Sequence, residues 1–162
     1  MKVHWREISS ASNSFAALAA ACEVHGYHLE GTTEPCPDVT CYSLNSITER
    51  SYRDEIAGAD CITIAGGPHA SACYSDVAQY ADYVVVGEGE YTLPALLATI
   101  EEGRDPPPGV ATARGYTPAR HTVLLDGYPP FSEVKGFIEI TRGCPPASSV
   151  KTALKMPLIR TQ

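Results

Sequence analysis

Two apolar runs of the sequence end in glycines that stand beside a few polar side chains able to contact a ligand. The first run ends in Gly66, Gly67 and His69, and the second ends in the Gly-Glu-Gly-Glu segment at residues 87–90. Both runs are rich in β-branched residues, as strands buried on both faces of a parallel sheet are. Open α/β sheets bind ligands at the carboxyl ends of their strands, where glycines let the backbone approach a flat or bulky molecule. We therefore predict that the two strands form one ligand-binding rim.

The polar side chains of this rim have alternative roles. His69 can hydrogen-bond a ligand, or its ring nitrogens can form hydrogen bonds with the neighbouring backbone instead. Glu88 and Glu90 can accept hydrogen bonds from a ligand, or they can complement the positive end of the next helix. The glycines themselves can be ordinary turn residues with positive φ angles. The same ending on two successive strands favours the ligand rim over simple turns.

Composition limits the class of protein. The chain has 162 residues, of which 44% are hydrophobic, enough for one domain with a proper core and a tail. A net charge of −7 without a lysine or arginine cluster argues against nucleic-acid binding, which needs concentrated positive charge. The N-terminus lacks an apolar signal core, and no run reaches the ~18 apolar residues of a membrane span. We expect a soluble, cytoplasmic protein that binds neither nucleic acid nor membrane.

The six cysteines form no CxxC pair. Several fall within predicted strands or on a helix face, as reduced and buried thiols do. Cys36 and Cys41 are close enough in sequence to suggest a disulfide or a metal site, but Cys41 lies inside a predicted strand. Free thiols are therefore the favoured interpretation.

Strands and helices alternate through residues 1–103. Strands are predicted at residues 3–8, 27–32, 38–43, 61–65 and 83–86. Helices are predicted from residue 15 to Gly26, from residue 46 to Gly58, at residues 75–80, and from Thr92 to Gly103. Apolar stripes at helical spacing support the first and last helices: Phe15, Leu18, Ala19 and Cys22, and Leu93, Leu96, Leu97 and Ile100.

Local signals place the ends of these helices. A polar loop at residues 9–14 leads into the first helix. The Ser-Ile-Thr-Glu segment at residues 46–49 has the pattern of a capping box and opens the second helix. Thr92 is expected to cap the last helix, with Pro94 tolerated in its first turn and Gly103 ending it.

The alternation predicts an α/β fold, with a flavodoxin-like (Rossmann-like), doubly wound, five-stranded parallel sheet in the order 2-1-3-4-5. A proline-rich linker follows Gly103, and residues 110–112 and 121–125 are predicted to form a small hairpin, a C-terminal β extension. One more strand is predicted at residues 136–141. The domain assignment is an α/β domain at 1–103, a linker and hairpin at 104–135, and a remnant of a further domain at 136–162.

The glycine-ended segments 66–69 and 86–90, the proline linker and the terminal Ile-Glu-Ile-Thr-Arg-Gly-Cys-Pro segment at 138–145 occur in this order. Together they resemble the cobalamin (B12)-binding radical SAM proteins of the Fe–S oxidoreductase family. In that family a flavodoxin-like cobalamin domain precedes a partial TIM barrel, whose first strand ends in a CxxxCxxC loop that holds a 4Fe–4S cluster. The resemblance spans nearly the whole chain as far as Cys144.

The resemblance identifies Cys144 with the first cysteine of that loop. Ser148 and Lys151 stand where the second and third would be, and no cysteine follows. Serine and lysine cannot replace two thiolates, so neither the 4Fe–4S cluster nor S-adenosylmethionine is expected on this chain. Too few residues follow Cys144 for a barrel, which takes roughly 200 or more. We expect a truncated version of a longer enzyme, without catalytic activity of its own.

For the cobalamin half, the resemblance implies a corrin over the carboxyl ends of the strands. Ser43 matches the serine that meets the nucleotide tail of the cofactor. The residues implied in cofactor binding are Ser43, Gly66, Gly67, His69, Gly87, Glu88 and Gly89. Many cobalamin domains carry Asp-x-His-x-x-Gly after the first strand, whose histidine binds cobalt, but the loop at residues 9–14 contains no Asp, His or Gly.

Two functions follow as expectations. The first is a cobalamin-binding or cobalamin-derived domain of a radical SAM enzyme, whose full-length relative would carry out radical chemistry such as methyl transfer. Its partners would be the small-molecule cofactor and a radical SAM barrel domain. The second is a cofactor-free, flavodoxin-like docking module. The glycine rim favours the first, and the missing axial-ligand loop favours the second.

Overall fold

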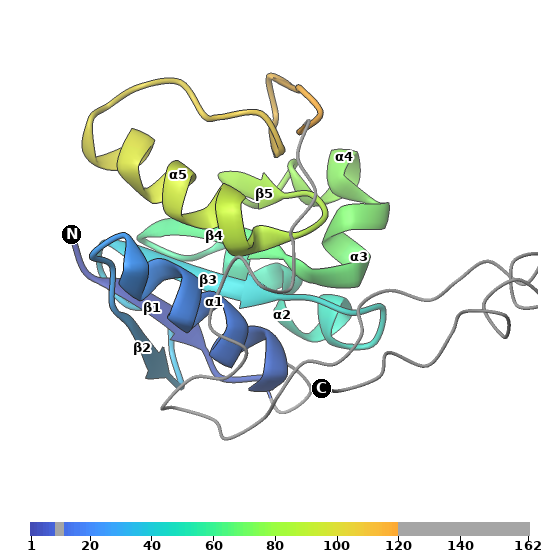
Figure 1. Ribbon diagram of the computed structural model, residues 1–162. Helices are drawn as coiled ribbons and strands as arrows, with labels where there is room; N and C mark the ends of the chain where they lie inside the picture. The colour runs from blue at the N-terminus through green and yellow to red at the C-terminus, as the bar shows by residue number, and fades with distance from the viewer. Residues whose placement is uncertain (9–11, 120–162) are drawn as a thin grey trace, which may run out of the picture.

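The computed structural model describes residues 1–8 and 12–119 (Figure 1). Its strands are β1 (Val3–Arg6), β2 (Leu29–Thr32), β3 (Val39–Ser43), β4 (Ile62–Gly66), β5 (Tyr83–Val85), β6 (Val110–Thr112) and β7 (Gly115–Tyr116). Its helices are α1 (Ser12–Val24), α2 (Thr48–Ala57), α3 (Gly67–Ala72), α4 (Tyr74–Val77) and α5 (Gly89–Glu101).

The strands form one sheet in the order β2-β1-β3-β4-β5-β6-β7. The first five strands in this order are parallel, and β6 and β7 join the β5 edge as antiparallel strands. The predicted flavodoxin-like order 2-1-3-4-5 is therefore confirmed, as is the α/β class.

Helices cover both faces of the sheet, as neighbouring residues of β1 show. Successive side chains of a strand point to opposite faces. Trp5 packs against Phe15 of α1, with ring centroids 5.7 Å apart, whereas the Arg6 guanidinium lies over the Tyr52 ring of α2 at 5.1 Å. The two helices therefore lie on opposite faces. Helices α1 and α5 contact each other on the first face, and a hydrogen bond from Tyr80 to Glu49 places the segment after α4 beside α2 on the second (Figure 1).

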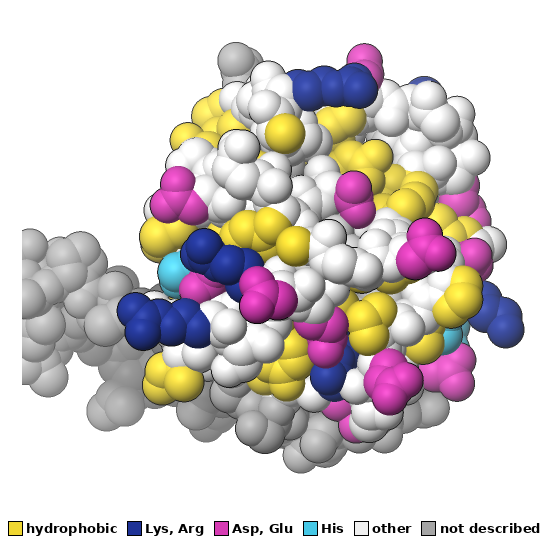
Figure 2. All heavy atoms as spheres, turned by 180° about the vertical axis from the view of Figure 1, so that it is seen from behind, with side chains coloured by type: hydrophobic (Ala, Val, Ile, Leu, Met, Phe, Trp, Pro, Cys, Tyr) yellow, Lys and Arg dark blue, Asp and Glu magenta, His cyan; other side chains and the backbone are white. Residues whose placement is uncertain are grey.

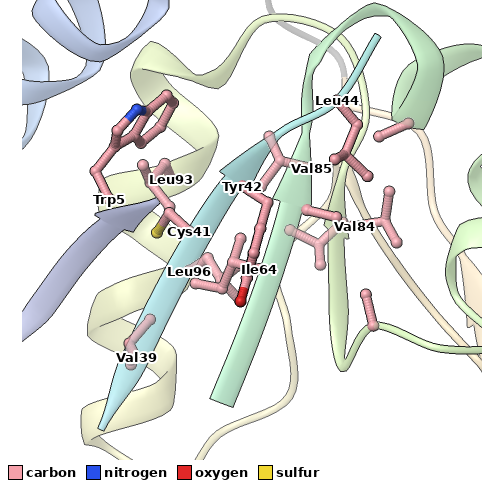
Figure 3. Close-up of a cluster of buried hydrophobic side chains, with 14 of the residues drawn as sticks. Trp5, Val39, Cys41, Tyr42, Leu44, Ile64, Val84, Val85, Leu93 and Leu96 are labelled. Atoms are coloured by element: carbon pink, nitrogen blue, oxygen red, sulfur yellow. The ribbon is translucent and has the colours of Figure 1, made fainter. Parts of the chain in front are cut away.

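The core is centred on β3, whose five residues are all buried. A central parallel strand with helices on both faces has no solvated side, so it takes a continuous apolar run. Figure 3 shows Leu93 and Leu96 of α5 gathered with Val39 and Cys41 of β3 and with Trp5 of β1. The apolar stripe predicted for the last helix therefore does face the core, with Leu93, Leu96 and Leu97 at most 2% exposed.

The capping box of α2 lies one residue earlier than predicted. The Asn45 side-chain oxygen accepts a hydrogen bond from the Thr48 amide at 2.9 Å, and the Thr48 hydroxyl oxygen accepts one from the Asn45 amide at 2.9 Å. This reciprocal pair does the work expected of Ser46 and Glu49. Glu49 is unavailable for capping because its carboxylate binds Arg53 and Tyr80 instead.

The other helix starts also differ from the sequence prediction. Helix α3 begins at Gly67, directly after β4, instead of near residue 75, and α4 ends at Val77. Helix α5 begins at Gly89, so Thr92 is not its cap and Pro94 lies inside the helix beyond its first turn. Both helices start as soon as a glycine has turned the chain away from its strand. The sequence prediction missed these starts because it treated the glycines as turn or rim residues and not as the first residues of helices.

The β extension is built differently from the prediction. Strand β6 turns directly into β7, with Ala111 opposite Tyr116, and not into residues 121–125. Those residues and the predicted strand at 136–141 lie outside the described residues. Because β6 pairs with β5, the hairpin continues the main sheet. The domain division at residues 103 and 135 stays a prediction.

Membrane crossing and surface charge concern the described part of the chain as a whole. None of its helices combines the length and apolar character that a bilayer crossing demands. On the face seen in Figure 2, the few basic side chains lie among acidic and apolar ones. The expected lack of nucleic-acid binding stays a prediction.

Candidate functional site

The fold brings all seven predicted cofactor-binding residues to one edge of the sheet. Ser43 ends β3 and lies opposite Gly66 at the end of β4. Gly67 and His69 lie in the first turn of α3, Gly87 and Glu88 lie in the connection from β5 to α5, and Gly89 begins α5. We call this edge the carboxyl rim and define it as Ser43, Gly66, Gly67, His69, Gly87, Glu88 and Gly89. The glycines within it have different physical roles.

Gly67 is required by the packing of the chain against itself. Its φ is +93°, and a Cβ atom there would lie 2.8 Å from the Leu44 carbonyl oxygen and 2.9 Å from the Leu44 nitrogen. Leu44 in turn donates its amide hydrogen to the Gly66 carbonyl at 2.8 Å and accepts one from the His69 amide at 3.0 Å. The β4–α3 junction is thus bonded to the loop after β3, and this contact by itself explains the glycine.

Gly89 also has an internal reason. A Cβ atom at this position would lie 2.8 Å from Cδ2 of Leu18 on α1. The first turn of α5 therefore needs a glycine to approach α1 with Leu18 in its present rotamer. Close contact between these two helices is part of the core packing on that face of the sheet.

Gly66 and Gly87, in contrast, leave space at the rim. Gly66 has an extended backbone, and a Cβ atom there would meet its nearest atoms at 3.8 Å, an ordinary contact. Gly87 is exposed, has a φ of +85°, and would have no atom within 4 Å of an added Cβ. These two positions keep the accessibility that the sequence suggested for all four glycines.

One polar residue of the rim was missed by sequence reasoning. The hydroxyl oxygen of Ser71 accepts a hydrogen bond from the Gly87 amide at 2.9 Å, which joins α3 to the loop after β5. Ser71 lies four residues after Gly67, on the same side of α3. This spacing would have identified Ser71 only if the start of α3 had been known.

His69 lies near an ion pair on the second face, formed by the buried Glu49 and the exposed Arg53. The Glu49 carboxylate is 4% exposed and accepts hydrogen bonds from Arg53 Nε at 2.6 Å and from the Tyr80 hydroxyl at 3.1 Å. The hydrogen bond from Arg53 is the main cause that lowers the pKa of Glu49, and the nearby His69 contributes to the same direction. His69 is half-buried, and its backbone is held by Leu44.

The acidic residues of the rim flank the start of α5. Glu88 occupies the N-cap position with an extended backbone, and its carbonyl oxygen accepts a hydrogen bond from the Thr92 hydroxyl at 3.3 Å. Glu90 lies in the first turn and is 5% exposed. Carboxylates at a helix N-terminus complement the positive end of its dipole, which is the second of the two roles considered for them.

The last side chain of β1 packs against α2. Arg6 makes two hydrogen bonds to the Glu55 carboxylate, at 2.9 and 3.1 Å, and lies over Tyr52. Tyr42, also on this face, is 1% exposed, and its hydroxyl has no hydrogen-bond partner in the described part of the chain. Burial raises the pKa of Tyr42, and the nearby Glu55 carboxylate raises it further, by its charge and as a potential acceptor just outside ordinary hydrogen-bond geometry. This face of β1 and β3 is therefore committed to packing against α2.

One large apolar side chain is exposed near the rim. Ile47, in the loop between β3 and α2, is 82% exposed. With the open backbone at Gly66 and Gly87, the rim suits a flat, partly apolar ligand that carries hydrogen-bonding groups. In residues 1–8 and 12–119 there is no group of three or more His, Cys, Asp or Glu residues placed to hold a metal ion. Cys36 and Cys41 are free thiols, and Cys144, Ser148 and Lys151 lie outside the described residues.

Comparison with protein-family models and with curated proteins finds no match. Among solved structures, the chain is similar to the radical S-adenosylmethionine methyltransferase TsrM from Kitasatospora setae, whose structure holds a tryptophan substrate and the SAM analog aza-SAM. The two chains are 20% identical with a TM-score of 0.58, and the match covers 75% of this chain but only 31% of the methyltransferase. At this identity the match shows a shared fold.

Proposed function

We propose that this chain is a cobalamin-binding or cobalamin-derived domain that belongs with a radical SAM enzyme. The observation that carries the proposal is the open backbone at Gly66 and Gly87, at the carboxyl ends of the neighbouring strands β4 and β5. A flavodoxin-like sheet binds its ligand at this edge. The fold shared with a radical SAM methyltransferase supports the same assignment.

The chemistry of the rim residues supports a corrin as the ligand. A corrin is a broad, nearly flat ring with amide groups on its periphery, so it needs exposed backbone and a few polar contacts. Gly66 and Gly87 leave room for the ring, and the half-buried His69 and Glu88 would contact peripheral amides. Ser43, 8% exposed and beside Gly66, would meet the nucleotide tail. When bound, cobalamin supplies a cobalt centre that carries the difficult chemistry.

The residues proposed for the cluster loop do not fit a 4Fe–4S cluster. A serine and a lysine stand at the second and third ligand positions, and only thiolates bind such a cluster well. The cluster and S-adenosylmethionine would therefore belong to a barrel domain of an intact relative. We expect this chain by itself to be catalytically inactive.

The path of the chain supports a domain partner next to the rim. The Gly109 carbonyl accepts a hydrogen bond from the Val86 amide at 2.9 Å, so Gly109 lies at the end of β5. A Cβ atom on Gly109 would be 3.1 Å from the Cβ of Ala119, the last described residue. Ala119 therefore lies near the carboxyl end of β5, where a partner domain on the rim would be within reach of it.

The second candidate function is a docking module without a cofactor. It is favoured by the loop after the first strand, because residues 9–14 contain no Asp, His or Gly that could supply the axial-ligand pattern of many cobalamin domains. Gly67 and Gly89, which serve internal packing, also weaken the argument from glycine number.

Titration of the purified full chain with hydroxocobalamin separates the two functions. After desalting, we expect corrin absorbance near one equivalent. Gly66→Leu, which fills the rim, should abolish retention, whereas Ala95→Leu, at an exposed position on α5, should not. Gly67 is unsuitable for this test because its replacement would disturb the fold. If the folded wild-type chain retains no corrin, the cofactor-binding proposal is wrong and the docking function stands.

A further inference from the structure

We propose that Ser71 is a positioning residue that holds the loop of residues 86–88 in the shape needed for a corrin on the carboxyl rim. This inference rests on the proposed function. Its starting observation is the hydrogen bond from the Gly87 amide to the Ser71 hydroxyl oxygen, 2.9 Å long, between two segments that are not otherwise adjacent in sequence.

The loop depends on few contacts of its own. Gly87 is exposed and left-handed, with no atom within 4 Å of the position of a Cβ, so side-chain packing does not hold it. Backbone hydrogen bonds tie its neighbour Val86 to Gly109 on one side. Ser71 on α3 holds Gly87 on the other. Without the Ser71 hydroxyl, the loop would keep the hydrogen bonds of Val86 and Glu88 at its two ends and lose the one at Gly87 between them.

Ser71 is itself placed by the first glycine loop. Helix α3 starts at Gly67, and its first turn is bonded to the chain after β3 through the His69 amide and the Leu44 carbonyl. The Leu44 amide is bonded to Gly66. Two sets of hydrogen bonds, joined through α3, therefore form a series across the carboxyl ends of β3, β4 and β5: Leu44 with Gly66 and His69, and Ser71 with Gly87.

Such a series matters for binding because a loop that is already in its bound shape loses little freedom when the ligand arrives. The Gly87 amide is at the surface, so water can replace Ser71 without leaving a buried group unpaired. Ser71→Ala should therefore loosen the loop while it leaves the global fold nearly unchanged. If the free energy of one typical hydrogen bond is needed to hold the loop in its bound shape, Ser71→Ala should weaken corrin binding by about 3- to 10-fold.

The test compares the wild-type chain with Ser71→Ala, Ser71→Thr and the control Ser75→Ala, at an exposed serine on α4. Hydrogen exchange followed by mass spectrometry, without ligand, reports on the peptide covering residues 84–90. Hydroxocobalamin titration reports on affinity, and thermal unfolding reports on the global fold. We expect faster exchange in that peptide and weaker corrin binding for Ser71→Ala alone, with both restored in Ser71→Thr because it keeps the hydroxyl.

The outcomes are distinguishable. Unchanged exchange at residues 84–90 in Ser71→Ala overturns the inference, as does corrin affinity equal to that of the wild type. A lowered unfolding temperature with faster exchange throughout the chain would show that Ser71 has a general structural role, which also overturns it. If the wild-type chain binds no corrin, the proposed function has failed, and the exchange data alone decide whether Ser71 holds the loop.

Discussion

Replacement of Gly67 by alanine should destabilise the protein strongly, and the same replacement of Gly66 should not. The φ of +93° at Gly67 costs a residue with a side chain about 1–2 kcal/mol. The new Cβ would also lie 2.8 Å from a backbone oxygen of Leu44. A backbone atom held by hydrogen bonds cannot move aside as a flexible side chain can, and such overpacking costs about 1–3 kcal/mol more. The expected total is about 2–5 kcal/mol, a large part of the roughly 5–15 kcal/mol that stabilises a domain.

Urea unfolding followed by circular dichroism measures this difference. Gly66→Ala is the matched control, because Gly66 is adjacent to Gly67 but has an extended backbone. A Cβ atom on Gly66 would meet its nearest atoms at 3.8 Å, an ordinary contact. We expect Gly66→Ala to change the free energy of unfolding by less than about 0.5 kcal/mol. If the two variants were equally stable, whether both were destabilised or neither was, the conclusion that Gly67 serves internal packing while Gly66 does not would be refuted.

Three further predictions follow from buried groups. Arg53 lowers the pKa of Glu49, so the ionised carboxylate stabilises the fold above its ordinary pKa of about 4.3, and this stabilisation is lost as pH falls through the pKa in the folded protein. Glu49→Gln should therefore lose less stability than the wild type between pH 7 and pH 3, as measured by urea unfolding. Tyr42→Phe removes a buried hydroxyl that lies near the Glu55 carboxylate but makes no hydrogen bond of ordinary geometry in the described residues, so it should be neutral or stabilising by up to about 1 kcal/mol. A clear loss of stability in urea unfolding would mean that the hydroxyl donates to Glu55 in solution. Burial raises the pKa of Cys22 to about 12 and also raises that of Cys41, so iodoacetamide at pH 8 should leave both unlabelled until the protein is denatured, and native labelling detected by mass spectrometry would contradict their burial.

Strand order and the rim were predictable because both depend on patterns that repeat along the chain. Apolar runs such as residues 61–65 and 83–86 are readable as buried parallel strands, and their regular alternation with helices restricts the topology to a few choices. Parallel strands place their carboxyl ends at one edge, so Ser43, Gly66 and Gly87 had to lie together once the order was known.

The helix starts were less predictable because several residues compete for each cap. Ser46 and Glu49 match the capping-box pattern as well as Asn45 and Thr48 do. The choice was made by Arg53, one turn further along α2, and by Tyr80, from another part of the fold, which both engage the Glu49 carboxylate. Local sequence contains no information about the contact with Tyr80.

The amino-acid sequence by itself determined the α/β class, the order of the parallel strands and the edge at which a ligand site would lie. These features follow from periodicity and from the handedness of the chain. Only the tertiary structure decided which glycine does what. Gly67 and Gly89 meet Leu44 and Leu18, whereas Gly87 meets nothing, because the space around a missing side chain is set by residues distant in sequence.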